Sequence, residues 1–112
     1  MEKKGNTIQI GDRTYDLKIG LRVIDIVESE LNKSILSLWK ETAEQTVKVS
    51  ELWTVLWGCV NVQNPKMTRD KFLTELDLQD TKINDLMSLF LTMVTESYSV
   101  EEKKKGDSDS KN

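Results

Sequence analysis

Apolar and polar residues alternate in two short runs near the start of the chain. The apolar members lie on either side of Gly11 and are Ile8, Ile10, Tyr15 and Leu17. A period of two predicts a strand with one buried face, and glycine readily adopts the positive φ that a tight turn needs. Residues 7–17 are therefore predicted to form a β-hairpin. Because an isolated hairpin is barely stable in water, its apolar face must pack against another element.

Further along the chain, apolar residues recur every three or four positions, which is the spacing of one helical face. The predicted helical segments are residues 19–31, a short turn that begins at 35, residues 51–62, 69–76, and 80 or 81 to about 98. Residues 41–48 are polar and lack a strong period, so a loop or a frayed helix end is expected there. Two segments, 51–62 and 81–98, carry apolar arcs of half the circumference or more, so they should be buried on most sides.

Polar residues and one proline mark the expected ends of these helices. Asn32 is expected to end the first helix. The expected N-caps, whose hydroxyls accept hydrogen bonds from first-turn amides, are Ser34, Ser50 and Thr68. Asn64-Pro65 should break the chain, because proline cannot continue a helix and disfavours helical geometry in the residue before it.

The predicted fold is mainly α-helical with a short N-terminal β-hairpin. Residues 7–100 are expected to form one domain, a small bundle of about four helices, because 112 residues suit a single core. Residues 1–6 are expected to be a flexible N-terminus. Residues 101–112 contain no apolar side chain and balance four acidic against four basic residues, so a disordered polar tail is expected.

Composition excludes several classes of function. The net charge is −3, and the 16 basic residues are spread along the chain, which argues against nucleic-acid binding. No apolar run approaches the roughly 20 residues of a membrane span, and no signal peptide is evident, so an intracellular protein is expected. The absence of histidine removes the commonest general base and metal ligand. We therefore expect a protein that is not an enzyme and has no cofactor or metal site.

Five residues are candidates for contact with a protein partner. Trp53 and Trp57 are spaced one turn apart beside an apolar stripe, and they suit either an interface anchor or a position under the hairpin. Met87 and Phe90 could line an adaptable groove, although such spacing is more often that of a core. Glu28 projects to the edge of an apolar face, where a carboxylate should find a basic or backbone partner and so fix helix packing or an interface.

Two wide apolar arcs in so short a chain suggest more apolar surface than one small monomer can cover. This surplus favours self-association or a protein partner. The lone Cys59 fits a reducing compartment. It lies on an apolar face without a basic neighbour at helical spacing, so a buried, unreactive thiol is expected.

The order of elements carries a family resemblance over residues 7–98. A hairpin, Ile-Gln-Ile-Gly-Asp-Arg-Thr-Tyr-Asp-Leu, leads into a helix with Glu28 near its end. Leu-Trp-Thr-Val-Leu-Trp-Gly-Cys follows at residues 52–59, and Asn-Pro-Lys-Met-Thr at 64–68. In these features the chain resembles the tail assembly chaperones of long-tailed bacteriophages. It departs from them in having Asn32-Lys33 where many members have a glycine after the first helix.

The resemblance implies an oligomeric protein of the infected bacterial cytoplasm that coats the tape measure protein and helps recruit tail tube subunits. Such a protein would be absent from the mature virion. A structural connector protein of a phage particle is an alternative with the same fold class. A small helical DNA-binding regulator is a further alternative, in which residues 50–76 would form two helices across a turn. Nearly balanced charges in that segment would weaken its attraction to phosphate.

Overall fold

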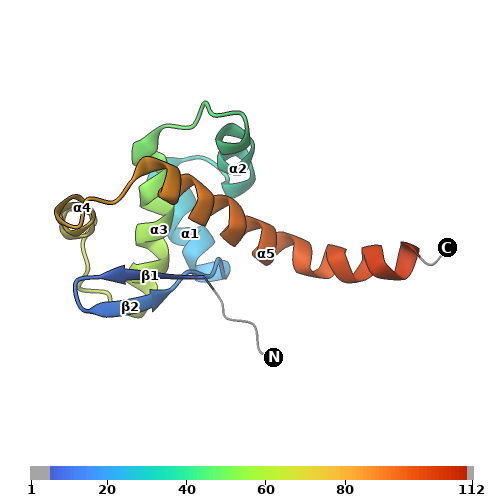
Figure 1. The fold of residues 1–112 in the computed structure, drawn as a ribbon, viewed down its shortest axis with the longest axis horizontal. Coiled ribbons are helices and arrows are strands. Elements are labelled where there is room, and N and C mark those ends of the chain that lie inside the picture. Colours follow the sequence, from blue (N-terminus) through green and yellow to red (C-terminus); the bar gives the residue numbers. More distant parts are fainter. Residues whose placement is uncertain (1–5, 111–112) are drawn as a thin grey trace.

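The structure, a computed structural model, describes residues 6–110, with side chains through Tyr98 (Figure 1). In chain order its described elements are β1 (Thr7–Ile10), β2 (Arg13–Asp16), α1 (Leu21–Leu31), α2 (Ile35–Ala43), α3 (Val49–Gln63), α4 (Arg69–Leu78) and α5 (Ile83–Ser110). The predicted fold class, mainly helical with an N-terminal hairpin, is confirmed. Apart from Asn6, the predicted flexible N-terminus lies outside the described residues.

The hairpin pairs β1 with β2 in antiparallel register, with Ile8 opposite Tyr15 and Ile10 opposite Arg13. Gly11 has φ of 67°, so the expected positive φ lies in the turn. Ile8, Ile10 and Tyr15 are buried while the intervening residues are exposed. This alternation places one face of the hairpin against α3 and α4, as the marginal stability of a lone hairpin requires.

Glutamine side chains bind the outer edges of both strands. On β2, the Asp16 amide donates to Gln63 Oε1 at 3.1 Å, and Gln63 Nε2 donates to the Asp16 carbonyl at 2.7 Å. On β1, Gln79 Nε2 donates to the Gln9 carbonyl at 2.8 Å. These bonds satisfy edge groups that would otherwise be open to another strand, and they tie the hairpin to the ends of α3 and α4.

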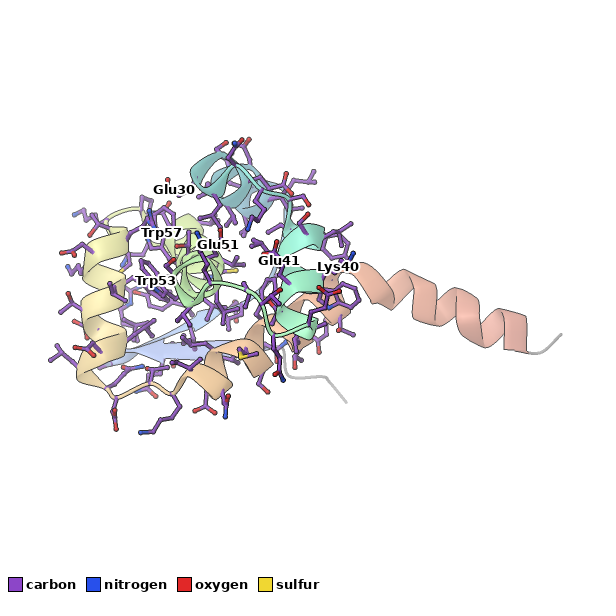
Figure 2. All side chains as sticks on the ribbon, turned by 90° about the horizontal axis from the view of Figure 1, so that it is seen from above. Glu30, Lys40, Glu41, Glu51, Trp53 and Trp57 are labelled. Atoms are coloured by element: carbon purple, nitrogen blue, oxygen red, sulfur yellow. The ribbon has the colours of Figure 1, made fainter. Side chains whose placement is uncertain are left out.

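Helix α3 is the centre of the fold, and Figure 2 views it nearly along its axis with the other elements around it. Every residue from Leu52 to Val60 is buried except Trp53, which is partly buried. Burial extends even to Thr54 and Gly58, which carry no large apolar side chain. At Gly58 the reason is close packing: a Cβ built there would lie 2.7 Å from Cγ2 of Val27 on α1.

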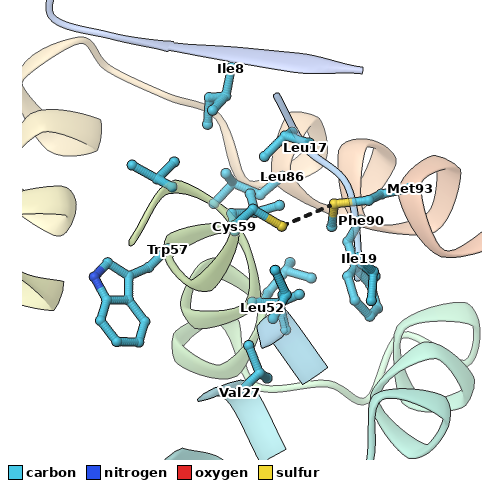
Figure 3. Packing of buried hydrophobic residues seen from close by; sticks show 14 of the residues in the cluster. Ile8, Leu17, Ile19, Val27, Leu52, Trp57, Cys59, Leu86, Phe90 and Met93 are labelled. Carbon is cyan, nitrogen blue, oxygen red and sulfur yellow. Dashed lines mark hydrogen bonds between the residues drawn. The ribbon is translucent and has the colours of Figure 1, made fainter. Parts of the chain in front are cut away.

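The core joins α3 to the hairpin on one side and to α1, α2 and α5 on the others (Figure 3). At its centre Cys59 Sγ lies 3.7 Å from Met93 Sδ, and Phe90 is fully buried. The largest side chains with almost no exposure are Phe72, Phe90, Ile35, Leu38, Leu52, Leu56 and Met93. Because these come from α2, α3, α4 and α5, and the fully buried Val27 comes from α1, a single core connects all parts of the helical bundle.

Two of the three predicted N-caps are confirmed. Ser34 Oγ accepts from the Ser37 amide at 3.0 Å, and Thr68 Oγ1 accepts from the Lys71 amide at 3.1 Å. The prediction for Ser50 is wrong, because α3 begins at Val49 and its N-cap is Lys48, which makes no side-chain cap. The Lys48 carbonyl accepts from the amides of Glu51 and Leu52, the third and fourth residues of the helix, so the first turn forms earlier than predicted.

Other helix ends differ from the predictions by a turn or more. The turn predicted at residue 35 is a nine-residue helix, α2, that extends to Ala43. Within it, Thr42 is buried and donates from Oγ1 to the Leu38 carbonyl at 2.7 Å. Helix α5 continues to Ser110, past the predicted end near Tyr98. The glutamates and lysines at residues 101–105 favour helix, whereas the glycine, aspartates and serines at 106–110 do not. The side chains beyond Tyr98 lie outside the described residues, and the solvated, disordered end of the chain stays a prediction.

Candidate partner-binding surface

Trp53 and Trp57, which suited either a partner anchor or a position under the hairpin, are both used inside the fold (Figure 2). Trp57 is 9% exposed, and its Nε1 donates to the Met67 carbonyl at 2.8 Å. Trp53 is partly buried, with its ring centroid 6.4 Å from that of Phe72 on α4. Both residues therefore attach α4 and the loop before it to α3. The interpretation of Trp57 as a partner anchor is corrected, because a buried indole offers no surface.

Arg69 also lies over the Trp53 ring, and it joins three helices. Its guanidinium carbon lies 5.1 Å from the centroid of the Trp53 ring, a cation–π geometry. Nη1 donates to Glu30 on α1 at 2.7 Å, and Nη2 donates to Thr54 on α3 at 2.9 Å. These contacts engage both Nη atoms of the guanidinium and one face of the indole, while the buried Nε makes no hydrogen bond to the described residues, so this corner of the molecule has a packing role.

The predicted pair Met87 and Phe90 separates in the fold. Phe90 is 0% exposed, which makes it a core residue and corrects its interpretation as part of a partner groove. Met87, three residues earlier on α5, is partly buried and packs at the edge of the core. The separation follows from helical geometry, since residues three apart lie about 60° apart around the axis and reach different depths.

Met87 lines a shallow pocket of about 270 Å³ between the α2–α3 connection and the first turns of α5. The pocket has an apolar part, formed by Val47, Val49, Leu52 and Met87, and two amides, those of Gln45 and Asn84. Val49 is 40% exposed at its rim. A flexible thioether beside branched aliphatic side chains can accommodate a partner's apolar side chain, while the amides offer hydrogen bonds around it.

Glu28 finds the backbone partner that its position demanded. Its Oε2 accepts from the Ile35 amide at 2.9 Å, at the first residue of α2. A carboxylate at a helix N-terminus satisfies an amide that has no partner within the helix, and it interacts favourably with the helix dipole. Glu28 thus fixes α2 against α1. Burial, and then the Glu28 charge, raise the pKa of Tyr98 on α5.

Lys33, in the connection between α1 and α2, makes a second polar link. Its Nζ donates to Glu41 on α2 and to Glu51 on α3, both at 3.1 Å. Hydrogen bonds to Glu51 and then Glu41 raise the pKa of Lys33, so the ammonium stays charged throughout the physiological range. The link joins the α1–α2 connection to both α2 and α3.

Cys59 is chemically quiet. Burial raises the pKa of its thiol to about 12, so almost no thiolate forms near neutral pH. Across the part of the chain that the structure describes, no group of three Cys, Asp or Glu residues could hold a metal ion.

Comparison with known sequence families assigns the chain to one of them. Residues 1–111 match the family described as "Family of unknown function (DUF6096)". The chain belongs to this family. No curated protein and no solved structure matches it. In the described residues of this DUF6096 member, no helix is both long enough and apolar enough to cross a membrane.

Sequence patterns missed most of the Met87 pocket. Val47 and Val49 lie in or beside the stretch that was predicted to be a loop, and Asn84 is one polar residue on a long helix. The available signal was the pair of valines in an otherwise polar segment. This chain folds the connection back onto α5, and only that tertiary contact reveals what the valines do.

Proposed function

We propose that this DUF6096 protein is a phage tail assembly chaperone that binds the tape measure protein and helps recruit tail tube subunits. The observation that carries the proposal is the Met87 pocket, an apolar recess with a valine exposed at its rim. Such a recess suits the apolar side of an amphipathic helix, the form in which long helical proteins expose aggregation-prone surface. The resemblance in element order supports the same function.

The proposed mechanism is reversible burial. A tape measure helix places one or two apolar side chains in the pocket, while Gln45 and Asn84 contact its polar backbone or side chains. Several copies of the chaperone along one tape measure protein cover its apolar stripe, and tail tube subunits then replace them. The interaction must be weak at each copy for this exchange, and a shallow pocket provides modest burial.

The charges of α4 argue against the DNA-binding alternative. In a helix-turn-helix formed by α3 and α4, the second helix would enter the major groove. The exposed charged residues of α4 are Asp70, Lys71 and Asp77, which together are net negative, and Arg69 is engaged by Glu30. This arrangement repels phosphate. The connector alternative shares the fold and is distinguished by mass spectrometry of purified virions, which should lack this chain if it is a chaperone.

The decisive test is co-expression of the tagged chain with the tape measure and tail tube proteins encoded by the same phage. We expect the wild-type chain to retain the tape measure protein in the soluble fraction and to co-purify with it. Val49→Asp, which places a charge at the pocket rim, should lose this capture. Leu36→Asp is the matched control, because Leu36 is 53% exposed on α2 and does not line the pocket. Recovery of neither phage protein with the wild-type chain would refute the proposal.

Light scattering across a range of protein concentrations tests the expected homo-oligomer separately. A discrete or concentration-dependent multimer supports coating by several joined copies. A strict monomer means that copies bind the tape measure protein individually, and the capture experiment then decides the proposal alone.

A further inference from the structure

A second apolar groove lies far along α3 from the Met87 pocket, between the start of α1 and the last turn of α3. It encloses about 400 Å³. Leu21 and Val62 stand at its sides, and the buried residues Val23 and Cys59 lie beneath them. Leu21 is 86% exposed, the largest exposed fraction among the large apolar side chains that the structure describes. The groove therefore presents apolar side chains that the described part of the chain leaves uncovered.

The charges around this groove are opposite in sign to that of the chain as a whole. Lys18 and Arg22 line it, and Asp16 is the acidic residue beside them. The full chain has a net charge of −3, so a locally positive lining is not a consequence of overall composition. Positive charge next to exposed apolar surface favours a ligand with apolar groups and carboxylates.

The start of α1 also favours a ligand that carries carboxylates. Its N-cap is Gly20, which has no side chain, and no side-chain cap forms there. The first amides of α1 therefore point out at the groove end without an acceptor from a capping side chain, and the helix dipole makes this end positive. The backbone thus reinforces Lys18 and Arg22.

We propose that this groove binds an amphipathic peptide segment of a protein partner, with an apolar anchor residue flanked by carboxylates. The anchor packs between Leu21 and Val62, and the carboxylates pair with Lys18, Arg22 and the first amides of α1. This inference deepens the proposed function by naming a second contact surface and the chemistry of the segment that it binds. It rests on that function only for the identity of the protein that supplies the segment.

The test uses defined peptides and the full chain. A fluorescein-labelled helical peptide of roughly 18 residues, with leucines on one face and glutamates on the other, is titrated with the protein and followed by anisotropy. A second peptide has lysine in place of every glutamate. We expect the acidic peptide to bind more tightly than the basic one, with an affinity that falls as salt is added.

Variants then locate the binding site. Leu21→Ser and Arg22→Glu should each weaken binding of the acidic peptide about tenfold or more, the scale of one lost leucine contact or one reversed charge. Leu36→Ser removes another exposed leucine, on α2 and outside the groove, and should leave the affinity unchanged. Amide shifts in a ¹⁵N spectrum should cluster at residues 18–23 and 59–63.

Several results would overturn this inference. They are absence of binding by the acidic peptide, equal binding of the basic peptide, and equal weakening by Leu36→Ser. A concentration-dependent dimer that Leu21→Ser abolishes would show instead that a second copy fills the groove. None of these results bears on capture of the tape measure protein through the Met87 pocket, so the two proposals fail independently.

Discussion

The contact between Gly58 and α1 gives the sharpest prediction. A Cβ at Gly58 would lie 2.7 Å from Val27 Cγ2 and 3.6 Å from Val23 Cγ1, and both valines are buried. Cβ atoms essentially never approach another carbon so closely, so Gly58→Ala must displace Val27 or separate the two helices. Val27 is 0% exposed, which leaves its side chain little room to move.

Two effects of opposite sign set the size of the stability change caused by Gly58→Ala. Overpacking a core by one methyl group costs about 1–3 kcal/mol. Alanine is favoured over glycine inside a helix by about 0.8–1.0 kcal/mol. Because the clash is with a fully buried branched side chain, we expect the steric cost to exceed the helical gain. Gly58→Ala should therefore lower the free energy of unfolding by about 1 kcal/mol, within a range of roughly 0–2 kcal/mol.

Urea unfolding, followed by tryptophan fluorescence, measures this change, and a double-mutant cycle assigns its cause. In a Val27→Ala background the clashing methyl group is gone, so Gly58→Ala should be neutral or stabilising by up to about 1 kcal/mol. Gly20→Ala is the control, because a Cβ there meets no heavy atom within 4 Å, and its effect should be the same in both backgrounds. The reasoning is refuted if Gly58→Ala stabilises the wild-type chain, or if it costs the same with and without Val27.

Three further predictions concern a helix cap, a linking carboxylate and the buried thiol. Lys48→Ser should place an accepting hydroxyl at the uncapped start of α3. This cap should raise the free energy of unfolding, measured in urea, by roughly 0.5–2 kcal/mol. A loss of stability would contradict this prediction. Glu28→Ala should lower the free energy of unfolding by roughly 1–3 kcal/mol, because the Ile35 amide loses a charged acceptor. Glu28→Gln should cause a smaller loss. Equal stability of the wild-type chain and both variants would show that the bond contributes nothing. Since burial raises the pKa of the Cys59 thiol from 9.0 to about 12, the unfolded chain ionises first, and the stability from the protonated thiol should be lost as pH rises from 9 toward 12. Unfolding curves of wild type and Cys59→Ala should therefore differ in pH dependence only in that window, and a parallel decline in both would contradict the assignment.

The predicted partner-binding residues illustrate why a side chain's role is harder to derive than its burial. Apolar spacing correctly placed Trp57, Met87 and Phe90 on inward-facing parts of their helices, and the spacing is identical for a core and for an interface. The depth of each residue depends on which neighbouring helix lies above it. Trp57 donates from Nε1 to the Met67 carbonyl in the loop before α4, and the bundle encloses Phe90, whereas Met87 remains at an edge.

The sequence by itself determined the local structure of this protein. Alternation around Gly11 specified the hairpin, and the hydroxyls of Ser34 and Thr68 specified two helix starts, because these effects act within a few residues. The αL conformation of Asn32, with φ of 56°, likewise follows from the tolerance of asparagine for that region, so this residue serves where a glycine is common.

Only the tertiary structure decided which apolar residues remain uncovered and what the polar residues link. Glu28 meets the Ile35 amide, Gln63 completes the edge of β2, and Gly58 admits Val27, and each of these pairs depends on how whole helices pack. The exposure of Leu21 and the pocket beside Met87 are what remains after that packing is complete. Burial and pairing are properties of the assembled bundle, because they depend on residues far apart in the chain, and periodicity within one helix contains no information about its neighbours.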